Sequence, residues 1–370
     1  MKLVVPTELY ENESRVSITP DIIPSLIKMG FKVFVQSNAG LDSSYTDDDY
    51  KKSGAIVSSK LSELYSKADL VIKIQRPSKQ KKIDEFKFLK NCNIITLLYE
   101  QKFKTEFSLL KKLNINVFAL EKMPRISRAQ SMDVLSSQSN LSGYKAVIDA
   151  ASLFNKAFPL MMTSAGTVAP AKVLIIGAGV AGLQAIATAK RLGAVVSSFD
   201  VRASTKEQVE SLGAKFIQVE EQGDSGETAA GYAKEMSASY KKKQAKLLED
   251  SIAKTDIVIT TALIPGKPAP KLITKKMIEL MKVGSVIIDL ASEFGGNCEL
   301  TKHGETVDYK SKKIVGPKNL PATVSQDSSR LFAKNVINFL MNSCESGKFS
   351  NFNWDDEVVK ETCVIRNLKN

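Results

Sequence analysis

The residues with the clearest chemical meaning form a glycine-rich run that begins at Gly177. A largely apolar segment, Lys172–Ile176, leads into Gly177-Ala178-Gly179-Val180-Ala181-Gly182, and a run rich in Ala, Leu and Ile follows. In a G-x-G-x-x-G turn between a strand and a helix, Gly177 makes the tight turn, Gly179 lets backbone approach a pyrophosphate and Gly182 permits close helix packing. Free N–H groups at the helix start would meet the phosphate charge. The run predicts a dinucleotide-binding loop; the alternative is a glycine turn without a nucleotide.

An acidic residue stands where the ribose of such a nucleotide would lie. Asp200 ends the next apolar segment, about 18 residues after Gly182. A carboxylate there binds the ribose hydroxyls and repels a 2′-phosphate, which favours NAD over NADP. Arg202 is close and weakens this preference, because arginine can accept the extra phosphate.

Groups that transfer protons near neutral pH are scarce. The single histidine, His303, lies in a polar stretch, Thr301–Glu305, that is typical of a turn. A substrate dehydrogenase usually needs a proton donor or acceptor beside the hydride centre, commonly histidine, although lysine or aspartate can serve. Hydride exchange between two nicotinamides needs only orientation and close approach of the rings. The scarcity of histidine favours such a reaction, but it does not exclude a substrate dehydrogenase.

Composition excludes several other classes of protein. The four cysteines, Cys92, Cys298, Cys344 and Cys363, form no C-x-x-C pair, which suits reduced thiols in a cytosol-like compartment. With one histidine and no clustered ligands, no metal site is predicted.

The net charge of +12 comes from 52 Lys+Arg against 40 Asp+Glu. The basic runs Lys79–Lys82 and Lys241–Lys243 have no interleaved aromatics, so a lysine-rich surface is favoured over nucleic-acid binding. The excess charge could also help to dock an acidic partner or a membrane surface.

The elements that would position these residues form two alternating series of strands and helices. At 370 residues the chain exceeds one ordinary core, so we expect two domains. Short apolar strands between helices predict parallel sheets covered on both faces. The expected strands are Lys2–Pro6, Lys32–Gln36, Asp69–Gln75, Asn93–Leu98, Asn116–Leu120, Lys172–Ile176, Val195–Asp200, Lys215–Val219, Asp256–Thr260, Ser285–Asp289 and Ile314–Val315.

Two helical segments suggest how the domains connect. Ala129–Ala157 predicts one or two long helices, and its middle, rich in Ser, Ala and Gly, would let other backbone approach closely. The helix Gln326–Met341 has no strand partner left in the second series, so we expect it to return to the first. The predicted fold is α/β with two Rossmann-like domains, residues 1–138 plus 327–370 and an inserted NAD-binding domain of residues 139–326. No segment is apolar enough for a membrane helix, and Met1–Pro6 is expected to be a strand rather than a signal peptide.

The segment Arg125–Asn140, RISRAQSMDVLSSQSN, carries a resemblance to a known family. It is similar to the NAD(H)-binding alpha subunit (domain I) of the proton-translocating, Si/Re-specific NAD(P) transhydrogenases. The similarity covers nearly the whole chain and suits the bacterial form with a separate soluble alpha subunit. Further matching segments are Ala187–Ala194, Thr205–Gly213, Thr260–Pro270 and Gly295–Cys298.

The resemblance implies roles for four residues. Arg125 is expected near the nicotinamide and pyrophosphate, and Asp133 and Ser136 would hold the carboxamide and orient the ring. Gln130 would reach toward the ribose of NADP(H) on a partner domain. Without the resemblance, the segment would be interpreted as a polar helix start with Asp133 as its cap.

The family has a mobile lid over NAD(H), which the resemblance places at Glu220–Ser239. Its glycines, Gly231 among them, would supply freedom, and Tyr232 would contact the nucleotide; a disordered surface loop is the alternative. The predicted cofactor-binding residues are Gly177, Ala178, Gly179, Val180, Gly182, Asp200, Val201, Arg202, Gly231, Tyr232, Ala262 and Leu263.

The same fold is similar to that of alanine dehydrogenase. Arg15 and Lys73 match the substrate-binding arginine and lysine of that family, and transhydrogenases keep some of these positions too. The alanine dehydrogenase histidine should fall near Thr96–Tyr99, where this chain has none. This departure argues against amino-acid oxidation.

The resemblance therefore implies direct hydride transfer from NADH to NADP+ held by a transhydrogenase beta subunit. Membrane-domain subunits would move the protons, and this chain would act as a homodimer at the cytoplasmic face of the cell membrane. Two other hypotheses remain: an alanine dehydrogenase-like enzyme and a non-catalytic NAD(H) sensor.

Overall fold

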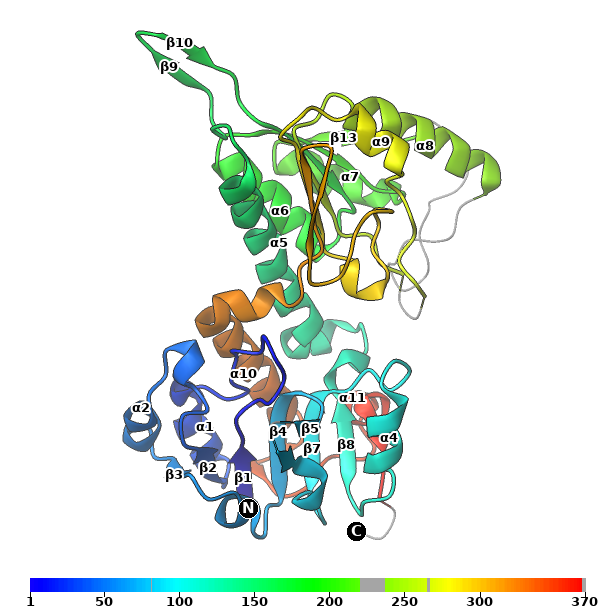
Figure 1. Ribbon diagram of the computed structural model, residues 1–370. Helices are drawn as coiled ribbons and strands as arrows, with labels where there is room; N and C mark the ends of the chain where they lie inside the picture. The colour runs from blue at the N-terminus through cyan, green and yellow to red at the C-terminus, as the bar shows by residue number, and fades with distance from the viewer. Residues whose placement is uncertain (81, 220–236, 265–266, 368–370) are drawn as a thin grey trace. The chain divides into compact units, whose positions relative to one another are not determined.

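Two α/β units make up the chain in the computed structural model (Figure 1). The structure describes residues 1–80, 82–219, 237–264 and 267–367. One unit comprises Met1–Gln138 and Pro321–Asn370, and the other comprises Ser139–Leu320. The chain returns to the first unit at Pro321, before the predicted residue 327, because Ala322 already accepts a hydrogen bond from Ser14. Each unit contains one mainly parallel sheet, which confirms the predicted fold class.

The first unit is built on a seven-stranded sheet in the order β20-β8-β7-β4-β1-β2-β3. Every pairing is parallel except that of β20 with β8. Apolar clusters cover both faces, as expected for strands that are buried on two sides. The strands are β1 (Lys2–Val5), β2 (Lys32–Gln36), β3 (Ile56–Ser58), β4 (Leu70–Gln75), β7 (Asn93–Leu97), β8 (Asn116–Ala119) and β20 (Cys363–Ile365).

Helix α10 (Ser325–Met341) lies in the C-terminal segment that returns to this unit. It buries Phe332, Val336 and Phe339 in the core that also contains strands β1 and β2. The other helices are α1 (Ile23–Lys28), α2 (Asp47–Lys52), α3 (Leu61–Tyr65), α4 (Lys104–Leu110) and α11 (Glu357–Thr362), and the short hairpins are β5–β6 (Lys79–Gln80, Ile83–Asp84) and β18–β19 (Cys344–Glu345, Lys348–Phe349).

The second unit has the sheet order β13-β12-β11-β14-β15-β17-β16. The first six strands run parallel in the 3-2-1-4-5-6 order of a dinucleotide-binding fold, and only β16 is antiparallel. The strands are β11 (Lys172–Ile176), β12 (Val195–Phe199), β13 (Lys215–Ile217), β14 (Ile257–Thr260), β15 (Val286–Asp289), β16 (Thr306–Tyr309) and β17 (Lys312–Val315).

The helices of this unit are α6 (Val180–Arg191), α7 (Lys206–Ser211), α8 (Ala238–Ile252), α9 (Lys275–Leu280) and most of α5 (Val134–Leu153). A hairpin, β9 (Met161–Thr163) and β10 (Gly166–Val168), extends from this unit (Figure 1). Within the described residues, no helix has the length and hydropathy needed to cross a membrane.

Candidate functional site

The glycine-rich run forms the turn between β11 and α6. Gly177 has φ +103°, a left-handed conformation that favours glycine, and Gly179 is the N-cap of α6. A Cβ at Gly182 would lie 1.8 Å from the carbonyl oxygen of Gly177, so this helix residue must be glycine for the turn to close. Thr261, which follows β14, donates to the same carbonyl oxygen at 3.0 Å. The start of α6 is therefore packed directly onto the end of the sheet.

Two further glycines shape the start of α6. A Cβ at Gly143 in α5 would lie 2.0 Å from the carbonyl oxygen of Ala181, which confirms that the small-residue middle of the 129–157 segment allows close backbone approach. A Cβ at Gly179 would meet no atom of the described residues within 4 Å, apart from its own chain neighbours. The first turn of α6 is thus packed closely against α5, while no described residue occupies the space that a side chain at Gly179 would fill.

Asp200 lies beside this turn, as the spacing predicted, but its carboxylate also has structural partners. It is 6% exposed and accepts from the backbone N–H of Ala178 at 2.7 Å. Arg202 binds the same carboxylate through Nε at 2.9 Å and Nη2 at 2.8 Å. Arg202, whose guanidinium weakened the predicted preference for NAD, is thus paired with Asp200. The intervening Val201 is partly exposed.

Sequence reasoning missed the residue that holds the Ala262–Leu263 segment. Asn297 is fully buried; its Oδ1 accepts from the N–H of Ala262 at 3.0 Å, and its Nδ2 donates to the carbonyls of Ala262 and Pro270, both at 2.9 Å. Asn297 lies in the Gly295–Cys298 segment, whose match to the resembled family could have marked it as a candidate residue. This amide fixes the backbone that follows β14 beside the turn.

The segment Ser127–Met132 is a 3-10 helix, and α5 begins two residues later. Asp133 Oδ1 accepts from the backbone N–H of Ser136 at 3.0 Å, and Oδ2 accepts from Ser136 Oγ at 2.6 Å. Asp133 therefore caps α5, and the two residues predicted to act together are bonded to each other. Gln130 is exposed on this 3-10 helix, and Arg125, two residues before the helix, is also exposed.

The two cations that match alanine dehydrogenase are buried in ion pairs. Arg15 binds Glu13 through Nε at 2.7 Å and donates to Gln138 Oε1 at 2.7 Å. Lys73 Nζ lies 2.7 Å from Glu85 and 3.3 Å from Glu8.

These pairs change how two of the buried groups titrate. Burial raises the pKa of Glu8 to about 7, against the opposing effect of Lys73. Burial would lower the pKa of Lys73, but the carboxylates of Glu8 and Glu85 outweigh it, so that pKa is raised.

His303 is exposed, and its Nδ1 is 3.0 Å from Ser292 Oγ. All four cysteines are free thiols, and the described residues contain no group of three or more His, Cys, Asp or Glu able to hold a metal. Gly231, Tyr232 and most of the predicted lid lie outside the described residues.

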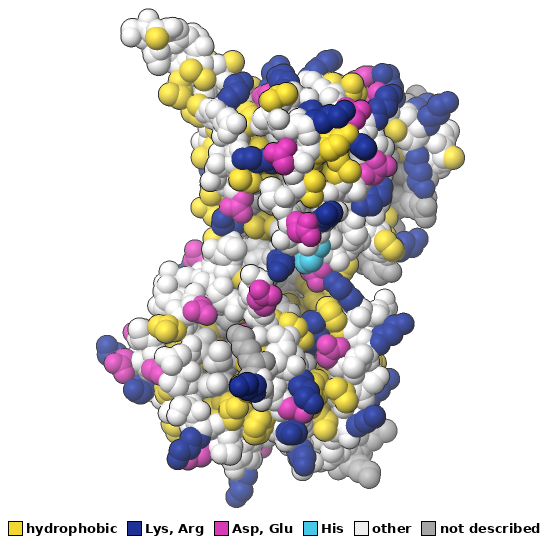
Figure 2. Space-filling view, viewed as in Figure 1, with side chains coloured by type: hydrophobic (Ala, Val, Ile, Leu, Met, Phe, Trp, Pro, Cys, Tyr) yellow, Lys and Arg dark blue, Asp and Glu magenta, His cyan; other side chains and the backbone are white. Residues whose placement is uncertain are grey.

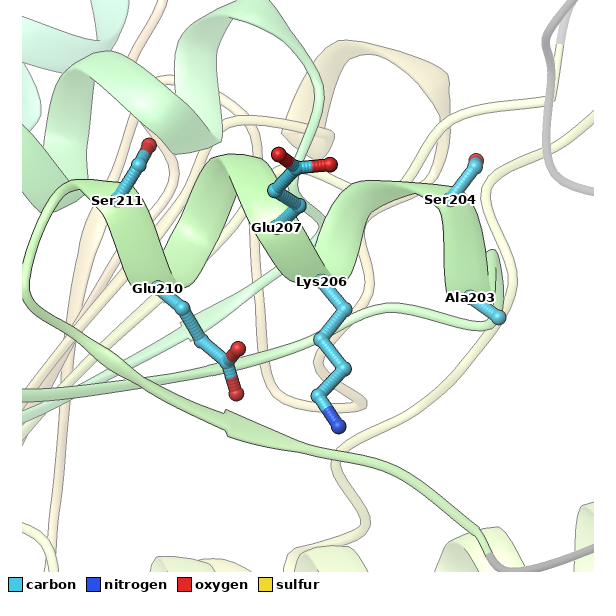
Figure 3. Close-up of a pocket in the computed structure, with 6 residues that line it drawn as sticks. All are labelled: Ala203, Ser204, Lys206, Glu207, Glu210 and Ser211. Atoms are coloured by element: carbon cyan, nitrogen blue, oxygen red, sulfur yellow. The ribbon is translucent and has the colours of Figure 1, made fainter.

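A depression along α7 is lined by Ala203, Ser204, Lys206, Glu207, Glu210 and Ser211, but Lys206 and Glu207 point in different directions and the side chains do not converge (Figure 3). On the face shown in Figure 2, Lys and Arg side chains are spread among acidic ones, which agrees with a lysine-rich solvated surface.

Comparison with known proteins places the chain in a family. The models described as "Alanine dehydrogenase/PNT, N-terminal domain" and "Alanine dehydrogenase/PNT, C-terminal domain" match residues 4–142 and 146–369. An NAD(P) transhydrogenase subunit alpha protein of Rhodospirillum rubrum is 52% identical, covering 99% of this chain and 96% of that protein. The corresponding protein of Rickettsia prowazekii is 46% identical, covering 100% and 96%. The crystal structure of transhydrogenase from Sinorhizobium meliloti matches with a TM-score of 0.89 at 44% identity, over 99% of both chains. The chain therefore belongs to the alanine dehydrogenase/PNT family and is similar to its transhydrogenase alpha subunits over almost its entire length.

Proposed function

We propose that this chain binds NADH and passes its hydride directly to NADP+ held by a transhydrogenase beta subunit. Membrane-domain subunits would couple the transfer to proton translocation, with this chain peripheral at the cytoplasmic face. The observation that carries the proposal is the Gly177–Gly182 turn, which sets the amide end of α6 at the carboxyl end of β11. In a sheet of this order, a dinucleotide binds where the strand order reverses, here between β11 and β14.

The turn and its neighbours suit the phosphates and the adenosine ribose. Backbone N–H groups at the start of α6 would bind the pyrophosphate, with Gly179 allowing close approach. Asp200 would accept from the ribose hydroxyls in exchange for hydrogen bonds that it now accepts, because one bond from Ala178 and three from Arg202 occupy the four acceptor positions of its carboxylate. With Arg202 already paired, NAD is favoured over NADP.

The segment around Asp133 suits the nicotinamide end. The Asp133–Ser136 pair is formed by the chain itself, and its remaining acceptor positions can take a carboxamide N–H. Arg125 offers a fixed charged fork, and Gln130 an exposed amide for the NADP(H) ribose of the partner. None of these roles requires a proton to move, as hydride exchange between nicotinamides demands.

The two other hypotheses have less support. An amino-acid dehydrogenase would need cations for the substrate carboxylate, and Arg15 and Lys73 already have carboxylate partners in this chain. It would also need an acid or base, and Thr96–Tyr99 supplies no histidine. A sensor has no need for an exposed segment such as Ser127–Met132. Alanine-dependent NAD+ reduction by the isolated chain would support the first of these hypotheses.

The reaction itself is the first test. Mixed with the NADP-binding domain of a transhydrogenase beta subunit, the chain is expected to transfer hydride rapidly from NADH to an NADP+ analogue, followed by absorbance. Gln130→Ala and Asp133→Asn should each lower the rate roughly 30-fold, because small misplacements of the rings are costly. Asn still caps a helix, so α5 should survive.

The matched control is Gln101→Ala, an exposed glutamine outside the segment, which should leave the rate unchanged. NADH binding without any transfer by the unaltered chain would remove the assignment and leave a dehydrogenase or a sensor.

We further propose that the chain acts as a homodimer through the β9–β10 hairpin. Met162, on this hairpin, is 81% exposed, and Leu160 and Met161 beside it are also exposed. A two-stranded hairpin is marginal alone in water, so an apolar one calls for a covering surface. Met162→Asp is expected to weaken dimerisation at least about tenfold, by the cost of burying a charge.

Sedimentation velocity across a concentration series measures this change. Met341→Asp, at an exposed methionine that ends α10, is the control and should leave the dimer intact. Equal association of both variants would place the dimer contact elsewhere.

A further inference from the structure

The corner between the 3-10 helix Ser127–Met132 and α5 is held by one buried amide from α10. Asn335 is 8% exposed; its Nδ2 donates to the carbonyl oxygen of Ser131 at 2.8 Å, and its Oδ1 accepts from Ser137 Oγ at 2.7 Å. The carbonyl can only accept, so the amide nitrogen must face it and the amide oxygen must face the hydroxyl. Asp133 and Ser136 lie between these two anchor points.

The Ser131 carbonyl needs such a donor because it lies in the last turn of a helix. The last carbonyls of a helix have no partner within it. Asn338, one turn after Asn335 on α10, also donates to this oxygen, at 3.0 Å. Residues three apart share a helix face, so two amides of α10 converge on one carbonyl.

Asn335 lies on a part of α10 that is fixed by packing in the core. Phe332, Val336 and Phe339, its near neighbours on α10, are fully buried in the core of the first unit. A side chain on such an element can hold a loop far more accurately than solvent can. Displacement of the corner would move Asp133 and Ser136 together, since both lie within four residues of an anchor.

We propose that Asn335 is a positioning residue for hydride transfer: it holds the Ser131–Ser137 corner in the geometry that presents the nicotinamide. The inference rests on the proposed function of that corner. It places Asn335 outside contact with either nucleotide. Its loss should therefore lower the rate of transfer while the contacts of the Gly177–Gly182 turn keep NADH bound.

The decisive variant is Asn335→Asp, which preserves size and the acceptor for Ser137 but loses the donor to Ser131. With saturating NADH and the beta-subunit NADP domain, the single-turnover rate should fall at least about tenfold. The dissociation constant for NADH, from its fluorescence, should change less than about threefold. A protonated aspartic acid again has a donor, so the ratio of variant to unaltered rate should rise as the pH falls.

Controls separate this role from a structural one. Lys334→Ala, at an exposed position of α10 directly before Asn335, keeps both amide bonds to Ser131 and should change the rate less than about threefold. Ser137→Ala, a milder change at the other anchor, should lower the rate, and adding it to Asn335→Asp should cost little more, because the two share one interaction.

Three results would overturn the inference: an unchanged rate in Asn335→Asp, a parallel loss of NADH binding, or a rate ratio that does not depend on pH. If Asn335→Asp does not fold, the Ser137→Ala rate decides alone, and an unchanged value overturns it. Failure of the unaltered chain to transfer hydride would instead overturn the proposed function, and this inference with it.

Discussion

Replacing Lys73 by methionine is expected to lower the free energy of unfolding by about 3–5 kcal/mol at pH 8, because it leaves buried carboxylates without their cation. Lys73 is 1% exposed and lies between Glu85 and Glu8, both of which are also buried. Methionine fills a similar volume but offers no charge. The two carboxylates would then face each other's field in a medium that solvates them poorly.

The loss should depend on pH in a definite direction. Burial already raises the pKa of Glu8 to about 7, above its value of about 4.3 in an unfolded chain. The folded state thus binds the proton more tightly, and the stability due to Glu8 falls as the pH rises from about 4 to about 7. Without Lys73 the pKa of Glu8 would rise further, so the variant should recover part of its loss at pH 5, where this carboxyl is protonated.

Urea unfolding at pH 5 and pH 8 measures both quantities. Lys79→Met is the matched control. Lys79 is exposed, and its ion pair with Asp84 is long, at 3.8 Å, so its loss should change the free energy of unfolding little at either pH. A loss in Lys73→Met that is equal at the two pH values would show that the carboxylates do not set the cost. It would point to packing around the side chain.

The parallel core of both sheets could be predicted from sequence because its signals are local. Apolar runs such as Lys172–Ile176 and Asn93–Leu97 are strands, and the glycine spacing marked the turn that follows β11. Three edge strands were missed. β3 has three residues, β16 alternates polar residues on an exposed edge, and β20 pairs with β8 only because the tail returns there. Such pairings depend on segments that are distant in sequence, and these short edge strands show little hydrophobic periodicity.

Side-chain networks around the candidate site were less accessible to sequence reasoning. Asp200 was predicted beside the turn, but its pairing with Arg202 and its bond to Ala178 depend on how the strand end curls. Asn297 and Asn335 are remote in sequence from the backbone that they hold, so spacing could not find them. Asp133 is a cap in the structure, and its proposed contact with the carboxamide is an additional role for the same carboxylate.

Replacing Gly182 by alanine is expected to lower NADH affinity at least about 100-fold, since the loss of one or two charge-assisted hydrogen bonds to the pyrophosphate costs about 3 kcal/mol. The added Cβ would lie 1.8 Å from the Gly177 carbonyl oxygen and 2.9 Å from its carbon, and backbone atoms cannot yield as a flexible side chain can. The start of α6 must therefore move away from β11. Such overpacking should also lower the free energy of unfolding by about 1–3 kcal/mol.

Gly179→Ala separates the effect on NADH affinity from the effect on stability. Within the part of the chain that the structure describes, its Cβ would meet no atom within 4 Å, and the residue has φ −79°, which alanine adopts readily. Only the change at the helix N-cap should affect the fold, by about 1 kcal/mol or less. NADH affinity should nevertheless fall, because the methyl group would stand where the pyrophosphate approaches the helix.

Fluorescence titration with NADH and urea unfolding of both variants complete the test. Normal NADH affinity in Gly182→Ala would mean that the nucleotide does not depend on the closed turn. Normal affinity in Gly179→Ala, with weakened binding in Gly182→Ala, would mean that NADH binding needs the closed turn but that the phosphates do not lie against Gly179. Weak binding in both, with instability confined to Gly182→Ala, is the pattern expected if the helix start itself receives the pyrophosphate.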